Sequence, residues 1–488
     1  MLTIRQVQSS VYGRKIYCYA GTALGYFNVR LFNAISEKQK VNSYDVDLFI
    51  YCTLDIMDEK SPKANEMYLG HLYNDQKYKS FGFISNTGIR MVLVLEAGCL
   101  SLKDQEIRGI FKKFHTQYCN AISNPFYKFG EEIQSKFLNG IKDKQLSVVT
   151  VSPQSVCSIS VKRGIRPFEA AQLISSYFLS KGISYVLDSS FGRLFCLEAA
   201  FEEFQSNATR PLLVSACPGF ICYAEKTHGK LLVPLLSRIR SPQAIQGAIV
   251  KDYLARKLDI PLSSIYHASV MPCFDKKLES SRSDFLVPGS EVRETDCVLS
   301  TVELDSVLNE VTQIVPSEAD GWLGDFARGV LLGNPGGSSG GFAEDLVRRF
   351  IAIHGGEPVR KQIAKNIDVT EVFVDGTMRL SVARVYGFRN IQNMVRKLKI
   401  GKCNYDYVEV MACPSGCGNG GGQLRADTTD ERNELLNKVE NAYESLNGTT
   451  DSLSTVMTEW SLLNPDWKNF LYTQYRIVET NISQTLQW

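Results

Sequence analysis

Two cysteines near the end of the chain, Cys413 and Cys417, have the chemistry of metal ligands. They stand four positions apart in a glycine-rich stretch that runs from Met411 to Gln423. Glycines let a backbone pack closely around a bulky group and aim N–H groups at it. Thiolates within such a backbone suit a soft, negatively charged metal centre. Two thiols do not complete a four-coordinate site, so further ligands must come from elsewhere in the chain.

Further cysteines follow apolar runs that are typical of strands. Cys217 comes shortly after one such run and Cys273 after another, as Cys413 does. Ligands of open α/β sheets lie at the carboxyl ends of strands, so these three cysteines are expected to converge, with Cys417 as the fourth ligand. Four thiolates bind a zinc ion or a [4Fe–4S] cluster, and a spread over roughly 200 residues favours the cluster. An ordinary core position is the alternative for Cys217 or Cys273 alone.

Two more stretches bear on this centre. The glycine-rich run at 333–341 lacks the Gly-Lys-Ser/Thr ending of a phosphate-binding loop, which favours a flexible loop close to the metal. Lys276 and Lys277 follow Cys273 and either belong to a solvated face or set a positive field near the centre.

The elements that position these residues indicate an α/β fold. A strand from Leu146, a helix over 167–179 and a strand over 182–188 predict a parallel sheet with crossover helices. We place a domain boundary near residue 145. The pattern of residues 1–144 predicts a separate small α/β domain, with strands at 15–20, 47–52, 80–84 and 89–95. It also predicts a helix that starts at Asp104 and has an apolar face formed by Ile107, Ile110 and Phe111.

Composition narrows the class of protein. The chain has 488 residues, enough for two or three domains, and its net charge of +2 argues against a nucleic-acid binder. Thirteen cysteines at irregular intervals do not resemble a disulfide framework, and the five histidines show no zinc-site spacing. No apolar stretch is long enough to span a bilayer and no signal peptide is evident, so the predicted compartment is the cytosol.

The N-terminal residues resemble a known family. The motifs lie at 53–60, 67–73, 106–111 and 124–127 and follow one another in that order. They look like the longin-fold subunits of the trafficking protein particle complex, most closely the sedlin-related, subunit-2-like member, over Lys15 to Asp143. The resemblance implies a five-stranded sheet packed with helices, contacts with other trafficking-complex subunits, and tethering of vesicles at the periphery of endoplasmic reticulum and Golgi.

The rest of the chain, 145–488, resembles the iron-only hydrogenase family. The motifs lie at 215–229, 241–243, 271–279, 295–299 and 411–423. They look like the cytosolic iron–sulfur assembly branch, the prelamin-A-recognition-factor-like proteins. The resemblance implies two α/β lobes with largely parallel sheets around a buried [4Fe–4S] cluster held by Cys217, Cys273, Cys413 and Cys417. In true hydrogenases the position of Cys417 also bridges to a diiron subsite.

Several residues depart from these families. Ala216 replaces the proton-relay cysteine of true hydrogenases and cannot carry a proton, which argues against hydrogen production. The assembly branch carries a second, N-terminal cluster, but Cys18, Cys52, Cys99 and Cys119 lack its Cys-x-x-Cys spacing. The tail, 480–488, ends on Trp488 and resembles the peptide read by the cytosolic targeting complex, although Gln487 stands where an acidic residue is common.

The sequence therefore predicts a non-catalytic adaptor that holds one [4Fe–4S] cluster and helps to deliver clusters to cytosolic apoproteins, fused to a vesicle-tethering module. Three alternatives stay open: a trafficking-complex subunit, a redox enzyme, and an artefactual fusion of two adjacent coding units.

Overall fold

The computed structural model describes residues 16–22, 53, 56–57, 60, 66–76, 78–84, 89–96, 103–112, 137, 140–308, 331–334, 336–426, 428–446 and 452–478. The chain divides into two compact units, Met1–Lys136 and Phe137–Trp488. The second unit starts before residue 145 because the ring of Phe137 packs against those of Phe178 and Tyr266, at centroid distances of 5.7 and 6.1 Å.

The N-terminal unit contains an antiparallel sheet in the order β1-β4-β3-β2. Residues 104–112 are helical and bury Ile107 and Phe111 against Phe83 and Leu93 on one face of the sheet. The predicted strands at 80–84 and 89–95 and this helix are confirmed, whereas β2 was not expected and the predicted strand at 47–52 lies outside the described residues. The strands are β1 (Ile16–Thr22), β2 (Tyr68–Asn74), β3 (Tyr78–Ile84) and β4 (Ile89–Glu96).

The C-terminal unit begins with an all-parallel sheet in the order β6-β5-β8-β9, which we call the parallel sheet. Every residue of its two central strands, β5 and β8, is buried, as expected where helices cover both faces. Its strands and the helices that follow β5 and β6 are β5 (Leu146–Val151), α5 (Pro153–Arg163), α6 (Pro167–Ser180), β6 (Tyr185–Asp188), α7 (Ser190–Ser206), β8 (Ile265–Met271) and β9 (Cys297–Ser300).

A second sheet, the mixed sheet, has the order β10-β11-β12-β13-β7. β10, β11 and β12 pair antiparallel, whereas β12, β13 and β7 pair parallel. The α/β fold with largely parallel sheets is confirmed, and the antiparallel meander β10–β12 is the part of it that the sequence did not predict. The elements are β7 (Leu212–Val214), α14 (Phe342–His354), β10 (Glu357–Ala364), β11 (Ile367–Val374), β12 (Thr377–Tyr386), α15 (Phe388–Lys399) and β13 (Tyr407–Met411).

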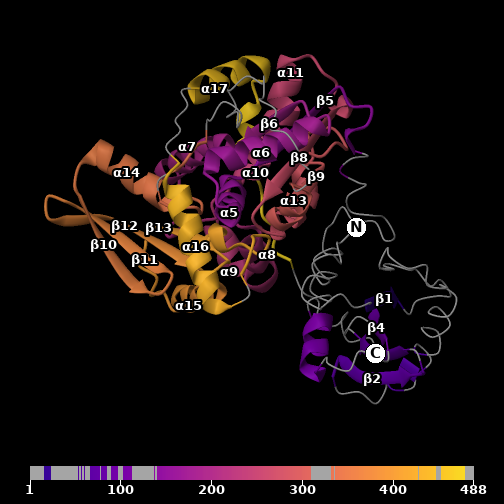
Figure 1. The fold of residues 1–488 in the computed structure, drawn as a ribbon. Helices are drawn as coiled ribbons and strands as arrows, with labels where there is room; N and C mark the ends of the chain where they lie inside the picture. The colour runs from indigo at the N-terminus through magenta and orange to yellow at the C-terminus, as the bar shows by residue number, and fades with distance from the viewer. Residues whose placement is uncertain are drawn as a thin grey trace. The chain divides into compact units, whose positions relative to one another are not determined.

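Helices connect and cover the two sheets. In Figure 1, the meander β10–β12 lies on one side of the C-terminal unit and β8 and β9 on the other, with α5 and α16 drawn between them. Val439 and Tyr443 of α16 pack on Cys157 of α5. No described helix is long and apolar enough to cross a membrane. The remaining α-helices are α8 (Pro218–Thr227), α9 (Gly229–Leu232), α10 (Pro242–Ala248), α11 (Ala255–Lys257), α12 (Asp275–Ser281), α13 (Thr301–Val307), α16 (Thr429–Glu444) and α17 (Ser452–Leu463).

Candidate metal centre

Two of the predicted ligands follow neighbouring parallel strands of the mixed sheet. β7 pairs with β13 so that Val214 lies opposite Glu409, and the carboxyl ends of both strands therefore share one edge. Cys217 follows β7 and precedes α8, while Cys413 follows β13. The backbone N–H of Ala412 donates to Sγ of Cys217 over 3.4 Å. The structure thus brings Cys217 to the residue next to Cys413.

The third predicted ligand, Cys273, follows β8 of the parallel sheet. It lies against the glycine-rich turn after Cys417, because the N–H of Gly422 donates to the carbonyl of Pro272 over 2.9 Å. A Cβ on Gly420 would overlap that same carbonyl oxygen. Glycine is therefore required at position 420 for the close approach of two backbones, whereas the sequence reasoning expected the glycines to pack around a bound group.

The fourth predicted ligand, Cys417, begins a short 3-10 turn over Cys417–Asn419. Its N–H donates to Oγ of Ser339 over 2.6 Å, and the next N–H, of Gly418, donates to Oγ of Ser338 over 3.1 Å. The glycine-rich run at 333–341 does lie beside the centre, as expected. The serine hydroxyls occupy these two N–H groups, which are therefore not among those that the glycine-rich stretch could aim at a bound group.

Burial governs the acidity of the four thiols. All four are free; Cys217 is buried and the other three are half-buried. Burial raises the pKa of Cys217 to about 11 and that of Cys413 to about 12, and it raises the pKa of Cys273 well above its ordinary value. The charges of Cys217 and Cys417 add to the rise for both Cys273 and Cys413. The thiols therefore interact electrostatically, and a metal group that binds them must displace protons.

Two cations oppose this trend at Cys417. Burial raises the pKa of its thiol, and the charges of Arg193 and Lys276 act in the opposite direction. The side chain of Arg193 donates to the hydroxyl of Tyr443 over 2.7 Å and is 5% exposed. No carboxylate among the described residues lies within ion-pair distance of Arg193. The buried carboxylate of Asp188 acts on this guanidinium at longer range, and a buried cation without an ion-pair partner favours a further anionic group nearby.

Lys276 and Lys277 are buried, so the solvated-face interpretation is wrong. The ammonium of Lys276 pairs with Glu279 over 2.8 Å, and that of Lys277 pairs with Glu303 over 2.7 Å. The alternative interpretation, a positive field near the centre, agrees with the effect of Lys276 on Cys417.

The sequence reasoning missed Arg193 and the two serines. Arg193 could have been found as the one charged residue in the apolar run Ser190–Leu197. Ser338 and Ser339 carried no such signal, because their partners are 80 and 78 positions away.

A cavity of about 540 Å³ opens next to two of the thiols. Cys273 and Cys413 line it, together with Phe274, Phe388 and Arg425. In the part of the chain that the structure describes, no three His, Cys, Asp or Glu side chains are close enough to hold a single metal ion. Four thiols on separate turns, with adjoining space and a buried cation, are a donor set that fits a larger anionic cluster.

Other predicted features lie outside the described residues. They include Cys52, Cys99, Cys119 and the tail with Trp488, and the side chain of Cys18 is not described either. The missing second cluster and the tail contact stay predictions.

Comparison with known proteins places the chain in a family. Residues 145–421 match the family described as iron only hydrogenase large subunit, C-terminal domain, and residues 26–145 match the family described as Sedlin. A probable cytosolic Fe-S cluster assembly factor of Brugia malayi is 51% identical over 360 residues, which are 71% of this chain and 79% of the relative. One of Caenorhabditis elegans is 48% identical over 373 residues, 73% and 81% of the two chains. The cytosolic Fe-S cluster assembly factor of Xenopus tropicalis is 39% identical over 383 residues, which are 73% of this chain and 79% of the relative.

Solved structures agree on the fold. An [FeFe]-hydrogenase matches with a TM-score of 0.57 and 24% identity, over 70% of this chain and 99% of its own. The apo [FeFe]-hydrogenase of Chlamydomonas reinhardtii matches with a TM-score of 0.57 and 23% identity, over 71% and 98%. With a Sedlin-type domain ahead of its hydrogenase-like region, the chain belongs to the family of iron-only-hydrogenase-like cytosolic Fe–S cluster assembly factors.

Proposed function

We propose that the C-terminal unit holds one [4Fe–4S] cluster through Cys217, Cys273, Cys413 and Cys417 and acts as a non-catalytic adaptor in cytosolic iron–sulfur assembly. The observation that carries this proposal is the joining of the two sheets at the centre: Cys217 accepts from the residue beside Cys413, and the turn after Cys417 bonds to the residue before Cys273. When bound, the cluster supplies an anionic centre that stores an electron and links the sheets.

The residue before Cys217 supports the non-catalytic part of the proposal. Ala216 is half-buried and packs against the apolar cores on both sides of β7. Its methyl group can neither accept nor donate a proton, so no side chain at this position can exchange protons with a group bound beside Cys217. A hydrogenase-type proton path through position 216 is therefore closed.

The metal content of the purified protein tests the cluster. Full-length protein purified without oxygen should contain iron and acid-labile sulfide near a 4:4 ratio per chain, as a single such cluster requires. Cys413→Ser should lose most of both. Cys403→Ser is the matched control, because Cys403 is also a half-buried free thiol, located in the loop before β13. Zinc or no metal after reconstitution, or full iron in Cys413→Ser, would defeat the proposal.

The adaptor role needs a separate test. The protein should co-purify with the cytosolic iron–sulfur targeting machinery, and removal of Trp488 should weaken that association if the aromatic ring and carboxylate are gripped together. The same assays are run in cells whose copy of this protein has all four proposed ligand cysteines replaced. If this variant still associates with the targeting machinery and the recipient apoproteins still receive iron, the cluster has no part in delivery.

A second function for the N-terminal unit is favoured by the match of residues 26–145 to the Sedlin family. We propose that this unit binds vesicle-tethering subunits at the surface of endoplasmic reticulum and Golgi. Co-purification with tethering subunits would support this. An immunoblot of the endogenous protein decides whether both units belong to one polypeptide: a single band near the full mass of 54.6 kDa is expected, and two smaller products would establish the fusion as artefactual.

A further inference from the structure

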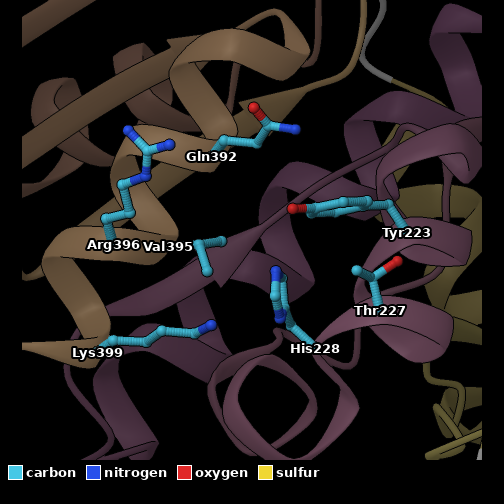
Figure 2. Close-up of a pocket in the computed structure, with 7 residues that line it drawn as sticks. All are labelled: Tyr223, Thr227, His228, Gln392, Val395, Arg396 and Lys399. Atoms are coloured by element: carbon cyan, nitrogen blue, oxygen red, sulfur yellow. The ribbon is translucent and has the colours of Figure 1, made fainter.

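A cavity of about 320 Å³ lies between α8 and α15, away from the four thiols. Figure 2 shows Arg396 and Lys399 of α15 on one side and Tyr223 and His228 on the other. The chain of Lys399 extends toward the His228 ring, and the Tyr223 hydroxyl points across the space toward α15. Sites for small molecules usually measure about 300 to 1,000 Å³, so this cavity suits a small ligand.

The apolar part of this cavity is held in place by ring contacts. Tyr223 packs edge-on against His228 and against Phe388, with centroid distances of 5.5 Å in both pairs. Val395 is buried and forms part of the lining between the two helices. The cavity is therefore formed before any ligand arrives.

The charge around the cavity is positive and lacks compensation. Residues 388–402 contain five cations and no carboxylate. Within the described ranges, neither Arg396 nor Lys399 has an ion pair or a side-chain hydrogen bond. Burial lowers the pKa of His228, and the charge of Lys399 on the opposite side of the cavity lowers it further.

Attraction of cations to a helix C-terminus is the simpler account of these residues. It applies equally to Lys397, which sits in the same last turn of α15 but does not line the cavity. The helix account therefore does not explain why the exposed Arg396 and Lys399 line the same open cavity as Tyr223. Lys397 also provides a control of equal charge.

We propose that this cavity binds a phosphate monoester. The planar guanidinium of Arg396 can donate two parallel hydrogen bonds to phosphate oxygens, and the ammonium of Lys399 adds a point charge. Tyr223 and Val395 contact the apolar or planar part of the ligand. The phosphate group can belong to a free small molecule or to a lipid headgroup, and the two sources are separated by experiment.

Two binding assays on the full-length protein test the proposal. Adenosine monophosphate is titrated by calorimetry, and vesicles of phosphatidylcholine with or without phosphatidic acid are sedimented with the protein. In at least one assay the protein should bind, and the double substitution Arg396→Gln with Lys399→Gln should weaken binding about tenfold or more. Lys397→Gln should bind as the unsubstituted protein does. Binding of adenosine monophosphate identifies a free phosphate ester, and binding only to phosphatidic acid vesicles identifies a lipid headgroup.

A second measurement keeps the test independent of the variants. In the unsubstituted protein, the ligand that binds should shift the NMR signals of the His228 ring and leave those of His267, buried in β8, unchanged. No binding in either assay would overturn the proposal. An equal loss in Lys397→Gln would also overturn it, because the binding would then come from a diffuse surface charge.

Discussion

Substitution of Gly420 by alanine gives the sharpest test of how the centre is built. The added Cβ would overlap the carbonyl oxygen of Pro272, the residue before Cys273. The obstacle is a backbone atom, so the two segments must separate by roughly 1 Å to restore normal contact. Ligand-to-metal distances vary by only about 0.2 Å, so a separation of this size would disrupt the cluster site. Overpacking of this kind also lowers the free energy of unfolding by about 1 to 3 kcal/mol. Gly420→Ala should therefore lose most of its cluster and melt at a lower temperature.

The neighbouring glycine provides the control. A Cβ on Gly421 would meet only Cδ2 of Phe274, at an ordinary 3.6 Å. Gly421→Ala should therefore keep its iron, its sulfide and its melting temperature. Both variants are purified without oxygen and assayed for iron, sulfide and thermal unfolding. Full cluster content in Gly420→Ala would refute the reasoning that the backbones at 272 and 420 set the separation of Cys273 and Cys417.

Three further predictions concern buried charged or titratable groups. Arg193→Met should make the cluster's midpoint potential more negative in a redox titration followed by electron paramagnetic resonance, because it removes a cation near the anionic centre, and Arg193→Lys should preserve the potential. Burial lowers the pKa of His267 from 6.5 to about 4, so the unfolded chain binds the proton first as the pH falls. In urea unfolding, the unsubstituted protein should lose about 3 kcal/mol more stability than His267→Gln between pH 6.5 and pH 4, because the other buried titrating groups, such as Asp188 with a pKa raised to about 6, contribute equally in both proteins. Arg240→Met should destabilise the protein by about 3 to 5 kcal/mol at pH 8. The guanidinium of Arg240 donates to both carboxylate oxygens of the buried Glu294, over 2.8 and 3.0 Å, and the substitution leaves that carboxylate without its partner. An unchanged midpoint of urea unfolding would contradict this.

The central strands of the C-terminal unit could be predicted because they are buried on both faces. β5 begins at the predicted Leu146, and β8 ends two residues before Cys273; polar residues such as Ser147 and His267 interrupt their apolar runs and are buried as well. β13 could be recognised from the alternation of Val408, Glu409 and Val410, and its following Cys413 with it. β7, β8 and β13 precede three of the four proposed ligands, Cys217, Cys273 and Cys413, so the outline of the centre was accessible from the sequence.

Within the meander, β11 and β12 carry the Asp375-Gly376 hairpin signal that the sequence reasoning overlooked, whereas the edge strand β10 carries no signal because it has no buried face. Every residue of β10 is exposed, and it contains Pro358, so neither alternation nor an apolar run marks it as a strand. The burial of Lys277 was missed for a related reason. Its partner Glu303 lies 26 positions away on another helix, and only the tertiary structure brings the two together.

The two sheets reach the centre in different ways, and this bears on what a cluster would do there. Cys217 and Cys413 belong to one sheet and are held next to each other by the register of β7 and β13. Cys273 belongs to the other sheet and is held near Cys417 by the contact of Pro272 with the glycine turn. Hydrogen bonds of the protein already connect the two sheets at this point. The ligands of a cluster would therefore be in position before it binds, and little backbone entropy would be lost on binding. Its contribution to stability would then come from joining two folded sheets, in contrast to small zinc domains that are unfolded until the metal binds.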